Sequence, residues 1–101
     1  RNSRYSESFK YCLRFLHNNF IYLEDKNMEP ERPLDALNDA RGKRVIVELK
    51  NKVQLIGKLK AFDIHINTVL EDAEEWENGT MKRKLGTAFI RGDTIILLSP
   101  A

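Results

Sequence analysis

Cysteine, histidine and long apolar runs are all scarce in this sequence of 101 residues. The single cysteine, Cys12, excludes internal disulfides, and one cysteine with two histidines argues against a structural zinc site, so we expect neither a metal nor a cofactor. No apolar run approaches the roughly 18 residues of a membrane span. Lys10, Arg14 and His17 interrupt the apolar stretch near the start, so we also expect no secretory signal. These absences favour a reducing, cytoplasmic setting.

Charge of one sign is scarce as well, because the formal net charge is only +2. Five basic and three acidic residues precede Met28, and the remainder has twelve of each. A neutral body argues against broad, charge-driven nucleic-acid binding, so such a function needs a local site or many copies of one site. With 42% hydrophobic and 32% charged residues, the chain can bury the core of one small domain. Because the sequence begins with Arg1, we expect a fragment or a processed form.

A polar, proline-containing stretch at residues 24–33 reads as a linker. It divides the chain into an N-terminal extension, residues 1–27, and a domain over residues 28–101. In the extension, apolar residues recur at spacings of three and four, which predicts an amphipathic helix. These residues are Phe9, Cys12, Leu13, Leu16, Phe20 and Leu23. The helix would dock on the neighbouring domain or on another copy, or alternatively lie on a membrane surface.

The domain is expected to open with a short helix over residues 33–41. Pro33 suits the first turn, Leu34, Leu37 and Ala40 share one face, and Gly42 suits the position after the helix end.

Five strands are expected to follow, because apolar and polar residues alternate through most of the remainder. Asn51-Lys52 predicts a tight turn, with asparagine tolerating a positive φ, and Asn78-Gly79 is a strong hairpin signal. Gly57 inside a strand marks a sharp bend or a close backbone approach. The fold class is therefore mainly β: an N-terminal helix and a strongly bent, five-stranded antiparallel sheet or small open barrel, with the helical extension added.

The last strand, residues 94–98, is apolar on both faces and would be a hazardous edge if left open. Pairing with another subunit is the economical way to cover it.

Two polar clusters break the apolar alternation. In the first, Asp63, His65 and Asn67 share a parity and are expected to project together, while Ile64 and Ile66 face the core. In the second, Arg91 and Asp93 flank Gly92, which allows a tight turn and a close approach.

Residues 32–101 resemble the Sm and Sm-like (Lsm) proteins, most closely the archaeal ones. The resemblance covers both halves of a two-part signature, in order and at sensible spacing. Its first half is matched by Val47-Glu48-Leu49-Lys50, Gly57-Lys58-Leu59, Phe62-Asp63-Ile64-His65-Ile66-Asn67 and Val69-Leu70-Glu71-Asp72-Ala73-Glu74. Its second half is matched by Leu85-Gly86-Thr87, Ile90-Arg91-Gly92-Asp93 and Ser99-Pro100. Asn51-Lys52 departs from the family, whose members often carry a glycine there.

The resemblance implies the Sm fold and a homo-oligomeric ring in which the fifth strand pairs with a neighbour's fourth. Archaeal rings usually have seven members. The bacterial relative Hfq forms six-membered rings, but its second motif is built around Lys-His, from which Ile90-Arg91-Gly92-Asp93 departs. We therefore expect a heptamer.

The resemblance further implies binding of single-stranded, uridine-rich RNA at the central pore, one nucleotide per subunit, in RNA processing or ribonucleoprotein assembly. His65 and Arg91 would sandwich the base, and Asn67 would read its edge. Gly92 would let the backbone approach, with a main-chain N–H near Asp93 adding a hydrogen bond. Asp63 and Asp93 would orient Asn67 and Arg91, because a carboxylate facing phosphate would repel it.

Plainer interpretations stay open beside these. Asn67 could merely cap a turn beside a partly buried His65, and Arg91–Asp93 could be a structural ion pair at a subunit boundary. The basic residues Arg41, Lys43 and Arg44 could form a second RNA site or be ordinary surface charge.

At the level of function, the alternative is a protein-interaction scaffold ring with little RNA binding, in which the extension serves as a docking arm. An enzyme is not expected, since Cys12, His17 and His65 offer no set of nucleophile, base and orienting group. A small-molecule substrate and a membrane partner are not expected either.

Overall fold

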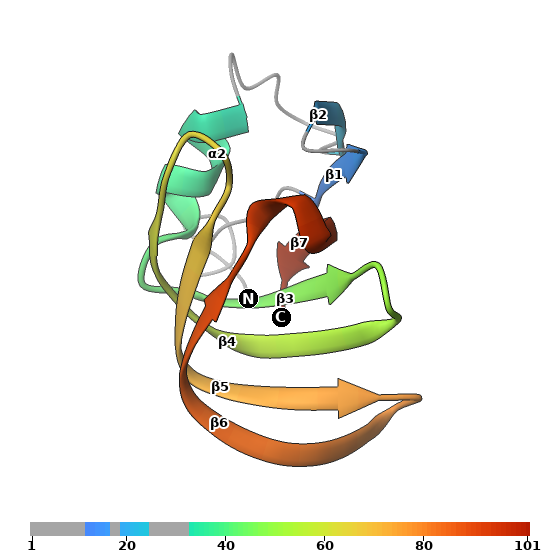
Figure 1. Ribbon diagram of the computed structural model, residues 1–101. Helices are drawn as coiled ribbons and strands as arrows, with labels where there is room; N and C mark the ends of the chain where they lie inside the picture. The colour runs from blue at the N-terminus through green and yellow to red at the C-terminus, as the bar shows by residue number, and fades with distance from the viewer. Residues whose placement is uncertain (1–11, 17–18, 25–32) are drawn as a thin grey trace, which may run out of the picture.

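The computed structural model describes residues 12–16, 19–24 and 33–101 (Figure 1). Their elements in chain order are β1 (Cys12–Leu16), β2 (Asn19–Glu24), α2 (Pro33–Ala40), β3 (Arg44–Leu49), β4 (Val53–Phe62), β5 (Thr68–Glu77), β6 (Thr80–Ile90), a 3-10 turn η1 (Gly92–Thr94) and β7 (Ile95–Pro100). The strands form one antiparallel sheet in the order β2-β1-β7-β3-β4-β5-β6. The expectation of a mainly β chain, with a helix before a bent antiparallel sheet, is confirmed, and the five strands expected after the helix are β3 to β7. The prediction that the sheet has only these five strands is wrong, because β1 and β2 extend it to seven. Among the described helices, none is long and apolar enough to cross a membrane.

Helix α2 covers the core through one apolar face. Ala36, Leu37 and Ala40 are fully buried, and Gly42, at φ +81°, ends the helix by donating its N–H to the Leu59 carbonyl at 2.8 Å. The prediction that Leu34 shares the buried face is wrong, since its side chain is 36% exposed. Successive helical residues turn by about 100°, which places Leu34 well away from the direction shared by the three buried residues.

The sheet bends where three neighbouring strands have irregular backbone. A Cβ on Gly57 in β4 would lie 2.9 Å from the Glu71 carbonyl oxygen of β5, so the predicted close backbone approach is confirmed. Opposite it, Asp72 takes φ +52°, and Gly86 in β6 takes φ +76°. Register shifts accompany these positions in both strand pairs. The long strands β4, β5 and β6 consequently curve together around the core (Figure 1).

The two predicted turns form, but in different ways. Asn78 and Gly79 both have positive φ, at 55° and 77°, as a two-residue hairpin turn requires. In the first turn the positive φ falls on Lys52, at 70°, and not on Asn51 as expected. Asn51 instead accepts the Val53 N–H on its Oδ1 at 3.0 Å, so it stabilises the turn through its side chain.

The prediction of a helical N-terminal extension is wrong for the residues that the structure describes. β1 and β2 pair as an antiparallel hairpin, and β1 also pairs with β7 through Leu13↔Leu98 and Arg14↔Leu97. Leu13 and Phe15 are buried on either side of a half-buried Arg14, which is the two-residue period of a strand. Main-chain partners on β7 select this period over the helical one, a choice that local spacing alone cannot make. Phe9 and most of the predicted linker lie outside the described residues.

The apolar edge of β7 is therefore covered by the chain itself. β7 lies between β3 and β1, whereas pairing with another subunit was expected to cover it. β6 is an edge strand of the described sheet, and its Phe89 side chain is 80% exposed.

Candidate functional site

The two predicted polar clusters meet at one end of the sheet. The first lies in the loop between β4 and β5, and the second in the connection from β6 to β7. Gly92 donates its backbone N–H to Asn67 Oδ1 at 2.7 Å, which joins loops 25 residues apart in the sequence. The structure thus brings Asp63, Asn67, Arg91 and Gly92 into one small region, as the sequence analysis expected.

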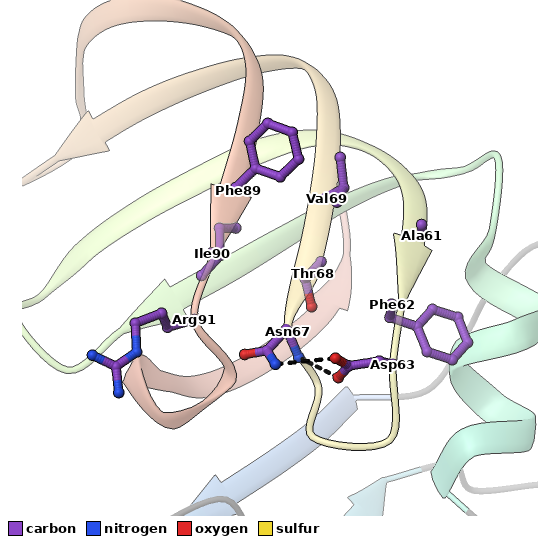
Figure 2. A pocket seen from close by; sticks show the side chains of 9 residues that line it. All are labelled: Ala61, Phe62, Asp63, Asn67, Thr68, Val69, Phe89, Ile90 and Arg91. Atoms are coloured by element: carbon purple, nitrogen blue, oxygen red, sulfur yellow. Dashed lines mark hydrogen bonds between the residues drawn. The ribbon is translucent and has the colours of Figure 1, made fainter.

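Asp63 organises the first loop through both carboxylate oxygens. Its Oδ1 accepts the backbone N–H groups of His65, at 2.8 Å, and Asn67, at 3.1 Å. Its Oδ2 accepts Asn67 Nδ2 at 3.0 Å, and Figure 2 draws both bonds between Asp63 and Asn67. The side-chain hydrogen bond from Asn67, together with the backbone N–H groups, lowers the pKa of Asp63 below its ordinary value of 3.8. These contacts fit the expected orienting role of Asp63 toward Asn67.

The expectation that Ile64 and Ile66 both face the core is half wrong. Ile66 is buried, with 6% of its surface exposed, but Ile64 is 73% exposed. Strand parity fails because residues 63–67 form a turn: Ile66 takes φ +64° and donates its N–H to the Asp63 carbonyl at 2.9 Å. A β-branched residue with positive φ is strained, so the burial of Ile66 and the Asp63 contacts must stabilise this conformation.

Gly92 lets the two loops touch, as predicted. A Cβ at this position would overlap the His65 carbonyl oxygen and lie 2.8 Å from the Ile66 carbonyl carbon. Both obstacles are backbone atoms and cannot swing aside. Glycine is therefore required here by the close approach of two chain segments.

Arg91 and Asp93 form the second half of the site. Arg91 Nη2 and Asp93 Oδ2 are 2.7 Å apart, and the Arg91 side chain is 81% exposed. Asp93 Oδ1 is buried and has no hydrogen-bond partner within the described ranges. Thr94 Oγ1 donates to the Arg91 carbonyl at 2.7 Å, which fixes the turn. The ion pair therefore holds an exposed guanidinium at the start of the β6–β7 connection.

The Asn67 amide keeps unused hydrogen-bonding capacity. Its Oδ1 accepts one N–H and its Nδ2 donates one hydrogen, so each atom retains one further position. His65, from the same turn, is exposed. An imidazole and a guanidinium plane are both suited to stacking on a flat ring, and an oriented amide can read the edge of such a ring.

A mostly apolar cavity of about 420 Å³ adjoins these groups (Figure 2). It is lined by Ala61, Phe62, Asp63, Asn67, Thr68, Val69, Phe89, Ile90 and Arg91. Phe89 was not among the predicted site residues. It directly precedes the Ile90-Arg91 motif and is 80% exposed at this cavity. Its signal was an aromatic residue at an outward position of an edge strand.

Two further expectations concern the basic residues after α2 and a metal site. Arg41, Lys43 and Arg44 are all exposed after α2, so a second RNA site there stays a prediction. Within the described ranges there is no group of three or more His, Cys, Asp or Glu residues that could hold a metal ion.

Known proteins are similar to the C-terminal domain of this chain. The LSM-domain family model matches residues 35–100. A protein of Archaeoglobus fulgidus described as snRNP Sm-like is 51% identical over 72 residues, which span 71% of this chain and 94% of its own length.

Two solved structures carry the same fold. The Pyrococcus abyssii Sm protein in complex with a uridine heptamer has a TM-score of 0.68 and 41% identity, with coverage of 70% of this chain and 100% of its own. The P. aerophilum SmAP1 heptamer has a TM-score of 0.65 and 39% identity, with coverage of 68% and 92%. With a family model over most of its length and relatives of this similarity, the chain belongs to the LSM family of Sm-like proteins of archaeal type.

Proposed function

We propose that this protein assembles into a seven-membered ring that binds single-stranded, uridine-rich RNA at its pore, one nucleotide per subunit. The observation that carries the proposal is the Gly92 N–H to Asn67 Oδ1 bond, because it aligns the two clusters into one pocket. The uridine heptamer bound by the Pyrococcus abyssii relative supports the ligand, and the P. aerophilum heptamer supports the ring. RNA processing or ribonucleoprotein assembly is the setting that such binding serves, and no catalysis is involved.

In the proposed pocket, a uracil stacks between the His65 imidazole and the Arg91 guanidinium. Stacking contributes about 1–3 kcal/mol per base and tolerates any base. Selectivity then depends on the unused donor and acceptor positions of Asn67, which complement the O4 and N3–H of uracil. The N–H groups of Gly92 and Thr94 are already engaged, which leaves the main-chain N–H of Asp93 as the further donor. Asp63 and Asp93 hold Asn67 and Arg91 in place.

The ring explains how a nearly neutral chain binds a polyanion. Each pocket is weak by itself, but seven pockets in a circle bind successive nucleotides of one strand at high effective concentration. In this arrangement residues 28–101 form the ring-building domain, which the match to residues 35–100 supports, and residues 1–27 are accessory.

The test compares binding of oligo-U and oligo-C by the intact ring, using fluorescence anisotropy. Asn67→Ala removes one or two hydrogen bonds to the base, each contributing about 0.5–1.5 kcal/mol, so the preference for oligo-U should fall several-fold. Arg91→Ala removes a stacking partner and should weaken binding of both oligomers. Asn38→Ala, which changes an exposed asparagine of α2, is the matched control and should leave both affinities unchanged.

Asn67 also holds Gly92, so the ratio of the two affinities is the deciding quantity. General damage to the pocket would lower both affinities together, whereas loss of base reading lowers their ratio. Equal loss on both oligomers would refute the selective role of Asn67. An intact ring that binds neither oligomer would favour a protein-interaction scaffold, the alternative function.

A further inference from the structure

The strand order identifies two edges that a partner chain can extend. Without β1 and β2, the sheet would run β7-β3-β4-β5-β6, and its edges would be β7 and β6. In this chain the N-terminal hairpin is added to β7, so that β2 and β6 are the outermost strands (Figure 1). The hairpin therefore occupies one of the two edges of the LSM sheet.

The heptameric relative and the uridine-bound relative have few or no residues beyond the matched part that could form such a hairpin. About two thirds of this chain covers 100% of the Pyrococcus abyssii protein and 92% of the P. aerophilum protein. Identical copies that close a ring head to tail must join one surface to a different one. An apolar strand edge favours pairing with another strand, which would continue the sheet across the subunit interface. In that case β6 of one copy pairs with β7 of the next.

The hairpin contact with β7 is short but apolar. β1 meets β7 at two residue pairs, whereas β3 meets it at five. Burial of Leu13 and Phe15, with 0% and 4% of their surfaces exposed, anchors the hairpin in the core. Because only two residue pairs join β1 to β7, release of the hairpin breaks few main-chain hydrogen bonds, and the two apolar anchors supply most of what holds it in place.

The opposite edge, β6, also exposes apolar side chains. On β6, Phe89 and Met81 are 80% and 40% exposed, and β6 has no second neighbour in the described sheet. On β7, Ile96 and Leu97 are only half-buried although β1 is paired with that strand. Both strands therefore retain apolar side chains for a further partner.

We propose that the β7 edge is an interaction surface contested by two occupants: the chain's own N-terminal hairpin and β6 of a second copy. This inference rests on the ring of the proposed function and adds its regulation. The hairpin acts as a removable cap, so that a protomer with the hairpin in place cannot enter the ring. An attached segment competes at an effective concentration on the order of millimolar, so the cap raises the protein concentration needed for assembly.

The decisive experiment locks the cap in the full chain. Arg14→Cys and Leu97→Cys, made together with Cys12→Ser, place two thiols at partner positions of β1 and β7. Partner Cα atoms of antiparallel strands are about 4.5–5.5 Å apart, within disulfide range. Assembly is measured by size-exclusion chromatography with light scattering, first oxidised and then after reduction of the same sample, with thiol titration to verify the bond.

The proposal predicts that the oxidised protein loses the ring and elutes as a single protomer, and that reduction restores the ring. A ring of equal size in both states would overturn the cap and leave the proposed function intact. A single protomer in both states, with the parent chain also failing to assemble, would overturn the ring and the cap together.

A second variant acts in the opposite direction. Leu13→Asp with Phe15→Asp loosens the hairpin anchors and should lower the concentration of half-assembly at least about tenfold, since the competitor is then no longer held in place. Leu34→Asp adds a charge at an exposed leucine of α2 and is the control. Half-assembly of the double variant at the parent's concentration, with its thermal melting retained, would contradict the cap.

Discussion

At the scale of single residues, Asn67 connects the two halves of the proposed pocket. Its amide oxygen accepts from Gly92 and its amide nitrogen donates to Asp63, so one side chain couples the β4–β5 loop to the β6–β7 connection. Asp63 in turn fixes the backbone of the same loop through His65 and Asn67. The side chain that is proposed to read the base is thereby oriented before RNA arrives, which avoids part of the ordering cost of binding.

A titration of Asp63 tests this coupling. Its pKa in the folded protein lies below the ordinary value of 3.8, so the fold favours the carboxylate. The resulting stabilisation is present above pH 3.8 and is lost as the pH falls through the lower, folded value. Carbon-detected NMR of the Asp63 carboxyl group should show this low pKa in the parent chain and a higher one in Asn67→Ala. Asn38→Ala is the control, and an Asp63 pKa that does not change in Asn67→Ala would contradict the coupling.

Sequence reasoning identified the residue types of the site but not their conformations. Asp63, Asn67, Arg91, Gly92 and Asp93 were found because polar residues interrupt an apolar alternation. The outward position of Ile64 and the positive φ of Ile66 were not predicted. The hydrogen bonds of the Asp63 carboxylate turn the chain here and override strand parity, and these contacts exist only in the folded loop.

At the scale of elements, the fold depends on the bend that β4, β5 and β6 share. Gly57, Asp72 and Gly86 mark that bend on three adjacent strands. Because of the bend, the same long strands pack against the core and also lead into the two loops of the pocket. Gly57 is required where β4 approaches the backbone of β5 closely, because any side chain there would collide with it.

Gly57→Ala should therefore destabilise the protein although it adds only one methyl group. The new Cβ would lie 2.9 Å from the Glu71 carbonyl oxygen and 3.0 Å from the Ala73 Cα, so the backbone of β5 must shift. We expect a loss of about 1–3 kcal/mol in the free energy of unfolding, measured by urea denaturation. Lys58→Ala, at the adjacent exposed residue, is the control. Equal urea midpoints for Gly57→Ala and the parent would show that the close approach is not a constraint.

The elements that sequence predicts well are those with local signals. Asn78-Gly79, Gly57 and the α2 boundaries at Pro33 and Gly42 each carry a backbone preference that holds in the fold. The hairpin of β1 and β2 was missed because Leu13 and Leu16 fit a helical spacing as well, and its β7 partner lies more than 80 residues further along the chain. Non-local main-chain pairing decided between two periods that the local sequence left open.

At the scale of the whole molecule, the proposed RNA pocket and the β7 edge belong to the same sheet. Its pocket end would hold RNA only weakly in a single protomer, and its β7 edge is closed by the chain's own hairpin. Ring closure would multiply the pockets and replace the hairpin contact with pairing to β6 of the next copy. Because assembly requires release of the hairpin and brings the RNA pockets together, RNA binding should favour the released hairpin, and release should favour RNA binding.

Native mass spectrometry of the full chain, with and without a seven-nucleotide oligo-U, tests ring-based uridine binding most directly. We expect a species of seven protomers carrying one oligonucleotide, with oligo-U increasing the assembled fraction more than oligo-C does. A chain that stays a single protomer at every concentration, and whose mass spectrum is unchanged by either oligonucleotide, would contradict it.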